Sequence, residues 1–138
     1  MAKIFTAPFA QTPKTLTAVA TLAIGGIGTD TVTNTVLIGT AGAEGAIVTR
    51  LTAIPRATVT ASSLVLFLSK DNGVTQRIID SELMSAYTLA ATTAVPETPF
   101  PNITETTPLR LEAGDKLYFG SQVALAAGIV AKTEWTDF

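Results

Sequence analysis

The sequence predicts an all-β protein, a single antiparallel β-sandwich or barrel of about eight short strands. Short runs that are apolar, or that alternate apolar with polar residues, recur at regular spacing and end at Gly, Pro, Asn or Asp. Helix signals are almost absent, since only residues 81–86 (SELMSA) could form a helical turn, with Ser81 as its cap. The 138 residues fit one domain with one core. We therefore predict a sandwich domain over residues 15–138 and an extended N-terminal arm over residues 1–14.

The arm is predicted from its prolines. Pro8 and Pro13 lack a backbone donor and favour extended geometry in the residues before them. Phe5 and Phe9 are large apolar side chains within this stretch. Two interpretations stay open: the two rings pack onto the protein's own core, or they reach onto a neighbouring subunit.

Three strands are predicted in the first half of the chain, over residues 15–24, 32–38 and 46–54. The first alternates strictly and so predicts a half-buried strand. In the third, Ile47, Leu51 and Ala53 are expected to face the core, with Arg50 and Thr52 facing solvent. Gly-rich loops at residues 25–30 and 39–45 separate the three strands.

Residues 62–80 predict a β-hairpin. An apolar run over residues 64–68 leads into Asp71-Asn72-Gly73, which suits a tight turn because Asn and Gly tolerate positive φ. On a two-layer sandwich one face of a strand usually meets solvent, where Val65 and Phe67 would be out of place. Their outward face must therefore be covered, by the N-terminal arm, by a Pro-rich loop or, as we favour, by a neighbouring subunit.

The second half of the chain predicts further short strands around one long loop. Residues 91–108 form a polar loop with four prolines and a single aromatic residue, Phe100. Short strands are expected at residues 87–90, 109–112 and 116–120. The last strand, residues 127–138, should turn one face to the core, consisting of Ile129, Ala131, Thr133 and Trp135.

The composition removes many kinds of chemistry. The chain has no Cys and no His, which excludes disulfides, thiolate or imidazole metal ligands and His-dependent nucleophiles. Neither Gly-rich loop carries the Lys-Ser/Thr pair of a phosphate-binding loop. Asp71-Asn72-Gly73 lacks the later oxygen ligands of a calcium loop. We therefore predict no enzyme activity, no cofactor, no bound metal and no small-molecule substrate.

Charge and hydropathy limit the partners. The net charge is −2, so no basic field attracts nucleic acid. No apolar stretch approaches the ~20 residues that span a bilayer, so no membrane partner is expected. Only 14% of the residues are charged, and Thr is abundant. A surface this poor in charge predicts that much of it is buried in an assembly.

Two segments resemble a known group of proteins. They are GAIVTRLTAIPRATVTASSLVLFLSKDNG (residues 45–73) and PLRLEAGDKLYFGSQVALAAGIVAKTEWTDF (residues 108–138). Together they resemble jelly-roll head decoration (cement) proteins of tailed bacteriophages, over roughly the last two thirds of the chain. The resemblance implies a jelly-roll-like β-sandwich on the outer surface of the virion head, often a homotrimer. It would clamp neighbouring subunits of the major capsid protein.

The expected function is therefore that of a virion structural protein. Partner contacts are predicted at Phe5, Phe9, Val65, Phe67 and Phe100. Two alternatives stay open. The first is another phage structural part, such as a head fibre base, a tail component or a connector protein. The second is a carbohydrate- or receptor-binding sandwich that uses loops such as residues 97–107.

Overall fold

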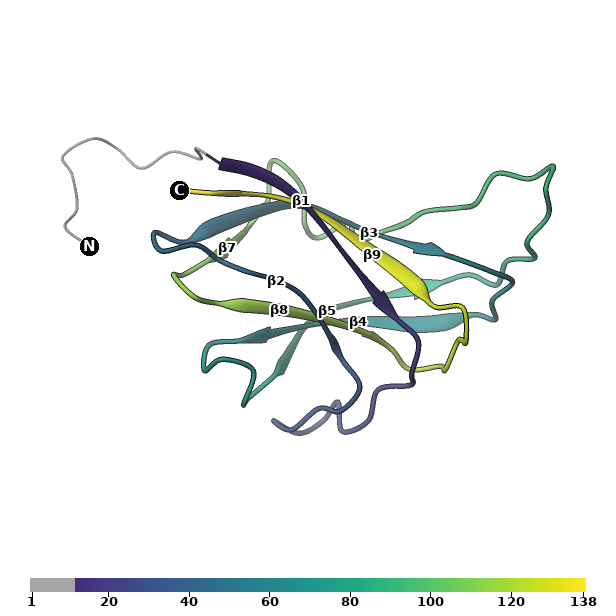
Figure 1. Ribbon diagram of the computed structural model, residues 1–138, viewed down its shortest axis with the longest axis horizontal. Coiled ribbons are helices and arrows are strands. Elements are labelled where there is room, and N and C mark those ends of the chain that lie inside the picture. The colour runs from purple at the N-terminus through teal and green to yellow at the C-terminus, as the bar shows by residue number, and fades with distance from the viewer. Residues whose placement is uncertain (1–11) are drawn as a thin grey trace.

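The computed structural model describes residues 12–138 (Figure 1). This part of the chain forms nine strands and no helix, which confirms the predicted all-β fold. The strands are β1 (Thr12–Ala20), β2 (Val36–Thr40), β3 (Ala46–Pro55), β4 (Ser62–Ser69), β5 (Arg77–Met84), β6 (Thr98–Pro99), β7 (Leu109–Leu111), β8 (Lys116–Ser121) and β9 (Ile129–Asp137).

The strands form two antiparallel sheets that pack face to face (Figure 1). Sheet A has the order β1-β9-β3-β6, with β7 also paired to β3, and sheet B has the order β2-β8-β4-β5. With the short β6 and β7 counted as one interrupted strand, this is the strand order of a jelly roll. β1 contacts β2 at one side of the sandwich, and β5 contacts β6 at the other. β1 and β5 therefore lie at diagonally opposite corners.

The main core lies between the sheets. Trp135, Phe100 and Phe119 are among its largest fully buried side chains. β9 turns its predicted face inward, and all four residues of that face are buried. A Cβ at Gly39 of β2 would overlap the Trp135 ring, so glycine is what lets the edge of sheet B approach the indole.

β3 differs from its predicted phase because it contains a β-bulge between Val48 and Arg50. The extra residue shifts the alternation, so Val48 and Leu51 are buried while Ile47 is only partly buried. Arg50 faces solvent as predicted. Thr52 was expected outside but is buried, because β6 pairs with it and Glu97 accepts a hydrogen bond from its hydroxyl (3.4 Å).

Several other boundaries differ from the predictions, and the strand predicted over residues 87–90 is wrong, since only Tyr87 makes a bridge there. β1 begins at Thr12, so residues 12–14 of the predicted arm belong to a strand that pairs with β9. Of the strand predicted over residues 32–38, only residues 36–38 are in β2. The helical turn predicted at residues 81–86 is wrong, since residues 81–84 belong to β5. The remainder of the predicted arm, with Phe5 and Phe9, lies outside the described residues.

The connection from β1 to β2 crosses the outer face of sheet B, and we call this segment, residues 21–35, the strap. Ile24, Ile27 and Val32 of the strap pack with Val65 and Phe67, whose exposed fractions are both 0%. Near its start the Ile24 amide donates to the Ser121 carbonyl (2.9 Å), and further along the Gln76 amide donates to the Asp30 carbonyl (2.9 Å). The strap thus builds a second, smaller core on sheet B.

This second core corrects the predicted interface. Both faces of β4 are covered, as predicted, but the cover is the strap of the same chain and not a neighbouring subunit. Phe100 is buried in the main core, and its amide donates to the Leu51 carbonyl (2.9 Å). Val65, Phe67 and Phe100 therefore have no surface to offer a partner, and their prediction as interface residues is wrong.

Candidate interaction surface

The exposed apolar side chains are concentrated in one part of the chain. Six of the nine large ones within residues 12–138 lie between residues 74 and 95. Four of them, Val74, Ile78, Ile79 and Leu83, lie on β5 or the turn before it, and we call these the β5 strip. Because exposed apolar groups cluster where proteins meet partners, this region is the candidate interaction surface.

The strip lies on the outer face of sheet B, beyond the strap. Ile78 pairs with Phe67 and Leu83 pairs with Ser63, both of which face outward on β4. A bulge at Ile79 separates the two pairs. The strap covers Phe67 but leaves Leu83 62% exposed. The strip therefore continues the covered apolar face of sheet B, and residues 12–138 leave this continuation exposed.

An ion pair marks the border between strap and strip. Arg77 donates to both carboxylate oxygens of Asp30, at 3.1 and 3.3 Å. These hydrogen bonds, together with the charge of Arg77, lower the pKa of Asp30 below its ordinary value. The carboxylate is thus ionised at neutral pH and ties the strap to β5.

β5 also carries acidic side chains on its other face. Asp80 Oδ1 accepts hydrogen bonds from the Ser81 amide (2.9 Å) and from Asn102 Nδ2 (3.2 Å). Its Oδ2 is buried and has no hydrogen-bond partner within residues 12–138. Glu82 points the same way, because it pairs with the core residue Leu64. Inward-facing charges on an edge strand discourage unspecific strand pairing.

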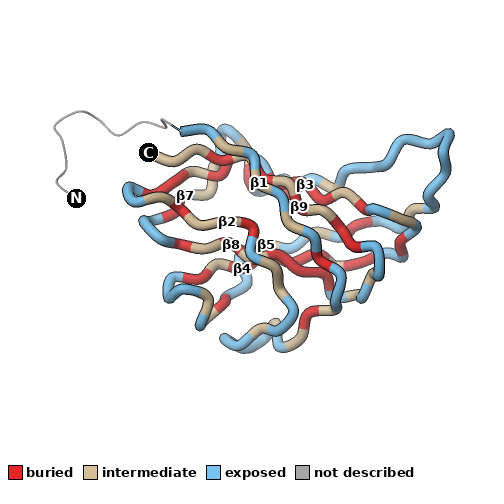
Figure 2. Tube along the Cα trace, viewed as in Figure 1, coloured by how far each residue is buried: buried red, intermediate tan, exposed pale blue. Residues whose placement is uncertain are grey.

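The second feature of the surface is a loop, residues 85–97, which we call the projecting loop. It extends well away from the sandwich, and residues 88–97 are all exposed (Figures 1 and 2). Leu89 and Val95 are 48% and 41% exposed. Residues 83–96 contain no charged residue.

Hydrogen bonds give the projecting loop a defined shape. At its base, Tyr87 and Val59 exchange two backbone hydrogen bonds, of 2.9 and 3.0 Å, and the Leu89 amide donates to Thr58 Oγ1 (3.0 Å). Further out, the Thr93 amide donates to the Ala90 carbonyl (3.2 Å), and the Tyr87 hydroxyl donates to the Thr93 carbonyl (3.4 Å). The loop therefore presents its apolar side chains from an organised backbone.

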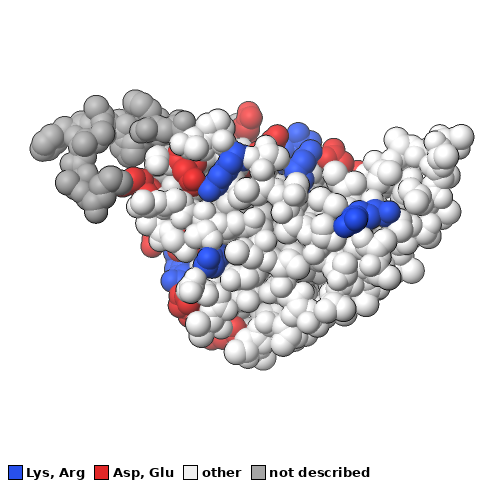
Figure 3. Space-filling model, in the orientation of Figure 1, with Lys and Arg blue, Asp and Glu red and all other residues white. Residues whose placement is uncertain are grey.

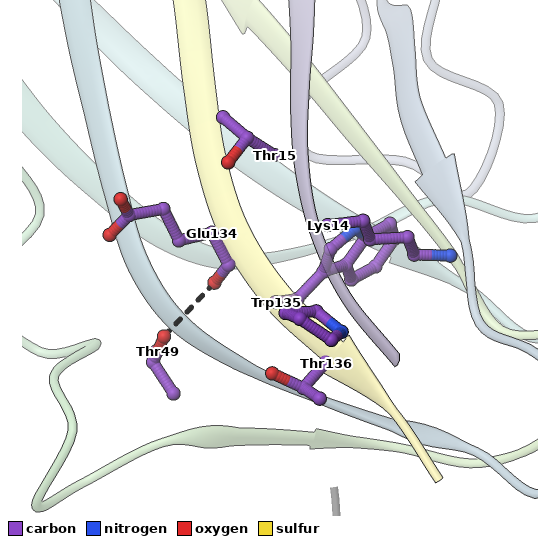
Figure 4. Close-up of a pocket in the computed structure, with 7 residues that line it drawn as sticks. Lys14, Thr15, Thr49, Glu134, Trp135 and Thr136 are labelled. Atoms are coloured by element: carbon purple, nitrogen blue, oxygen red, sulfur yellow. Dashed lines mark hydrogen bonds between the residues drawn. The ribbon is translucent and has the colours of Figure 1, made fainter. Parts of the chain in front are cut away.

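Sheet A has a different outer face, which is open and rich in Thr. A groove of about 360 Å³ lies there (Figure 4), lined by Pro13, Lys14, Thr15, Thr49, Glu134, Trp135 and Thr136. Thr49 Oγ1 donates to the Glu134 carbonyl across it (3.2 Å). Trp135 is 1% exposed, so its ring cannot stack on a sugar in this groove.

The charged groups beside Trp135 hold the sandwich corner together. Lys14 Nζ lies 4.8 Å from the centre of the Trp135 ring and 2.7 Å from Asp137 Oδ2. Asp137 also accepts from the Gly42 amide (3.1 Å). Burial alone would raise the pKa of Asp137, but the hydrogen bonds from Lys14 and Gly42 outweigh it and lower that pKa. These contacts join β1 and β9 to the loop after β2, which is a structural role.

The other motifs form turns. Asn72 and Gly73 have φ of 63° and 89°, as the hairpin prediction requires, and Asp71 Oδ1 accepts from the Thr75 amide (2.7 Å). That hydrogen bond lowers the pKa of Asp71. Within residues 12–138 no group of three acidic side chains is placed to hold a metal ion. The same residues contain no helix long and apolar enough to cross a membrane.

Figure 3 shows how little charge the face in view carries: a broad uncharged area covers its middle, and the charged side chains gather at one end and along the upper rim.

The sequence did not reveal the β5 strip, because Ile78, Ile79 and Leu83 look like core residues of a hairpin strand. Only the strand order shows that β5 is an edge strand of sheet B.

Comparison of the chain with protein-family models, with curated proteins and with solved structures found no significant match.

Proposed function

We propose that this chain is a non-enzymatic structural protein of a bacteriophage virion. In this proposal it is a decoration protein that binds the outside of the major capsid shell and stabilises it. The observation that carries the proposal is the projecting loop on a jelly-roll body, with its exposed Leu89 and Val95 and with no charged residue before Glu97 at its end.

Apolar side chains held in water gain nothing for the fold of one chain, whereas their burial against a partner stabilises the complex by about 25 cal/mol per Å². Residues 88–97 contribute almost no surface to the chain's own core. A hydrogen-bonded projection whose one charged residue, Glu97, lies beside β6 and pairs with Lys132 suits insertion between neighbouring subunits of a shell, where charged groups would be desolvated.

The resemblance to phage decoration proteins supports the same proposal. Its two segments, residues 45–73 and 108–138, supply β3, β4, β8 and β9, which are the central strands of both sheets. The resemblance therefore involves the body of the jelly roll, while the projecting loop lies between the two segments.

The proposal is tested on virions assembled from the genome that encodes this chain. We expect hundreds of copies on the outer surface of the head, counted by quantitative mass spectrometry and located by electron cryomicroscopy. A few copies per particle would indicate a tail, fibre or connector part instead. Absence from the particle, or glycan binding by the purified protein, would overturn the proposal.

A variant pair then tests the loop. We expect Leu89→Ser combined with Val95→Ser to abolish binding to heads that lack the protein, because both substitutions remove apolar contact area. Val19→Ser, at an exposed valine on β1, is the matched control and should bind like the natural chain. Equal binding by all three proteins would show that the loop is not the capsid contact.

A further inference from the structure

We propose that residues 2–10 of one copy of this chain dock on the β5 strip of a second copy, with Phe5 and Phe9 over Ile78 and Leu83. The inference rests on the proposed function and extends it, because it names the contact that joins copies of the protein to one another. It also provides a binding partner for the apolar side chains that the strap leaves uncovered.

The spacing of the two sets of side chains matches. Ile78 and Leu83 pair with Phe67 and Ser63. Their partners are four residues apart on β4, so the two side chains lie ~13 Å apart on the outer face. Phe5 and Phe9 are also four residues apart. In an extended chain they lie on one side at the same ~13 Å spacing.

The short chain between Phe9 and β1 keeps Phe9 from reaching the strip of its own copy. Phe9 precedes Thr12 of β1 by three residues, which span at most ~11 Å. β1 and β5 occupy diagonally opposite corners of the sandwich. Three strand spacings of ~4.8 Å and one sheet separation of ~10 Å place the axes of β1 and β5 ~17 Å apart. The strip is further from β1 than this, because it lies on the outer face of sheet B. The strip that Phe9 covers must therefore belong to a second copy.

Charge favours this occupant over a second β5 strand. Residues 2–10 contain Lys3 and no acidic residue, so they bring no negative charge to the edge strand whose other face carries Asp80 and Glu82. A two-fold pairing of β5 strands centred on Ser81 would instead set Asp80 opposite Glu82 of the other copy, twice, and like charges directly opposite one another destabilise a sheet.

The contact joins two different surfaces, the β1 corner of one copy and the β5 corner of the next. Such a heterologous contact generates a ring when its rotation closes. A ring of three copies agrees with the trimer that the resemblance implies. Each ring would bury three strips and leave the projecting loops to the capsid.

Disulfide trapping tests the contact directly, because the full-length chain contains no cysteine. One preparation carries Phe9→Cys, and a second carries Ile78→Cys or Leu83→Cys. After mixing and mild oxidation, we expect a covalent dimer of the two chains. The matched control is Leu37→Cys, an exposed leucine on β2, at the opposite edge of sheet B, which should give background cross-linking only.

Sedimentation of the purified protein provides the second readout. We expect a trimer for the natural chain, and monomer for Phe5→Ser combined with Phe9→Ser and for Leu83→Lys. Cross-linking no higher than with Leu37→Cys would overturn the inference, as would a disulfide that forms only when both cysteines are in one chain. A trimer that persists in both variants would overturn it too.

These results are separable from the proposed function. Head decoration without cross-linking would overturn only the contact between copies. Cross-linked trimers that do not bind heads would overturn only the proposed role on the virion.

Discussion

The outer faces of the two sheets differ. On sheet B, Val65 and Phe67 are apolar and lie under the strap, which gives this side of the jelly roll a third layer. On sheet A, Thr15 and Thr17 of β1 face solvent, and no strand of residues 12–138 lies over them. Composition explains the difference, since a strand with apolar residues on both faces needs cover on both, whereas an alternating strand needs cover on one.

The same difference between the two faces accounts for the position of the candidate interaction surface. The strap reaches the start of β5 at Asp30, which forms an ion pair with Arg77, and then returns to β2. Beyond that point the apolar face of sheet B continues as the β5 strip. Residues 12–138 thus cover their own second core and leave the outer part of the same face exposed.

The largest expected difference is between two variants that place the same charge on the outer face of sheet B and on the outer face of sheet A. In Val65→Lys an ammonium group lies beneath the strap with no partner, which we expect to cost at least about 4 kcal/mol, a large share of a typical domain's stability. Thr17→Lys places the same group on the open face of sheet A and should change stability by at most about 0.5 kcal/mol. Urea denaturation of the two variants measures both values.

If Val65→Lys does not fold, Val65→Ala gives the measurable version, with a loss of roughly 1–3 kcal/mol for a buried apolar side chain. Equal stabilities for the two Lys variants would show that the strap lifts freely from sheet B and that the difference between the faces is not energetic.

The sequence predicted the fold class because strand signals are local. Period-two alternation in β1 and β9, and the Asn72-Gly73 turn, need only neighbouring residues to be read. The bulge in β3 was missed because one extra residue at Thr49 leaves no local mark, yet it changes which side chains face inward.

The candidate surface depends on long-range facts. That β5 is an edge strand, and that the strap rather than another subunit covers Phe67, follow from the strand order and from contacts between segments about 40 residues apart in sequence. The sequence did show that Val65 and Phe67 need cover. It could not show which segment supplies it, because several apolar segments were available.

A glycine in sheet B gives the next largest effect. Gly120 lies directly under Ile24 of the strap, and an added Cβ would overlap the Ile24 side chain. We expect Gly120→Ala to cost about 1–3 kcal/mol, because the strap must shift outward to make room. Gly28→Ala is the control within the strap itself, since a Cβ there meets open space, and it should leave stability unchanged or slightly higher.

Hydrogen exchange locates the effect of Gly120→Ala. The amides of Ile24 and Gln76, which bond the strap to sheet B and to the hairpin, should exchange faster in this variant than in the natural chain. Exchange that increases throughout sheet A instead would mean that the strap and the sandwich unfold as one unit.

The smallest effect concerns the ion pair between Asp30 of the strap and Arg77 of β5. Arg77 holds the pKa of Asp30 below its ordinary value of 3.8, so the carboxylate stabilises the folded chain above that pH and loses its effect as the pH falls through the lowered value. Asp30→Asn should therefore lower the melting temperature slightly at pH 7, with the difference from the natural chain vanishing in acid. Both groups are exposed, so the shift in melting temperature should be smaller than that of Gly120→Ala.

Glu105→Gln, at a carboxylate without an ion pair in residues 12–138, is the control. A difference between Asp30→Asn and the natural chain that stays constant from pH 7 down to acid would show that the backbone bond from Gln76 to Asp30, and not the carboxylate, fixes the strap where the covered face ends.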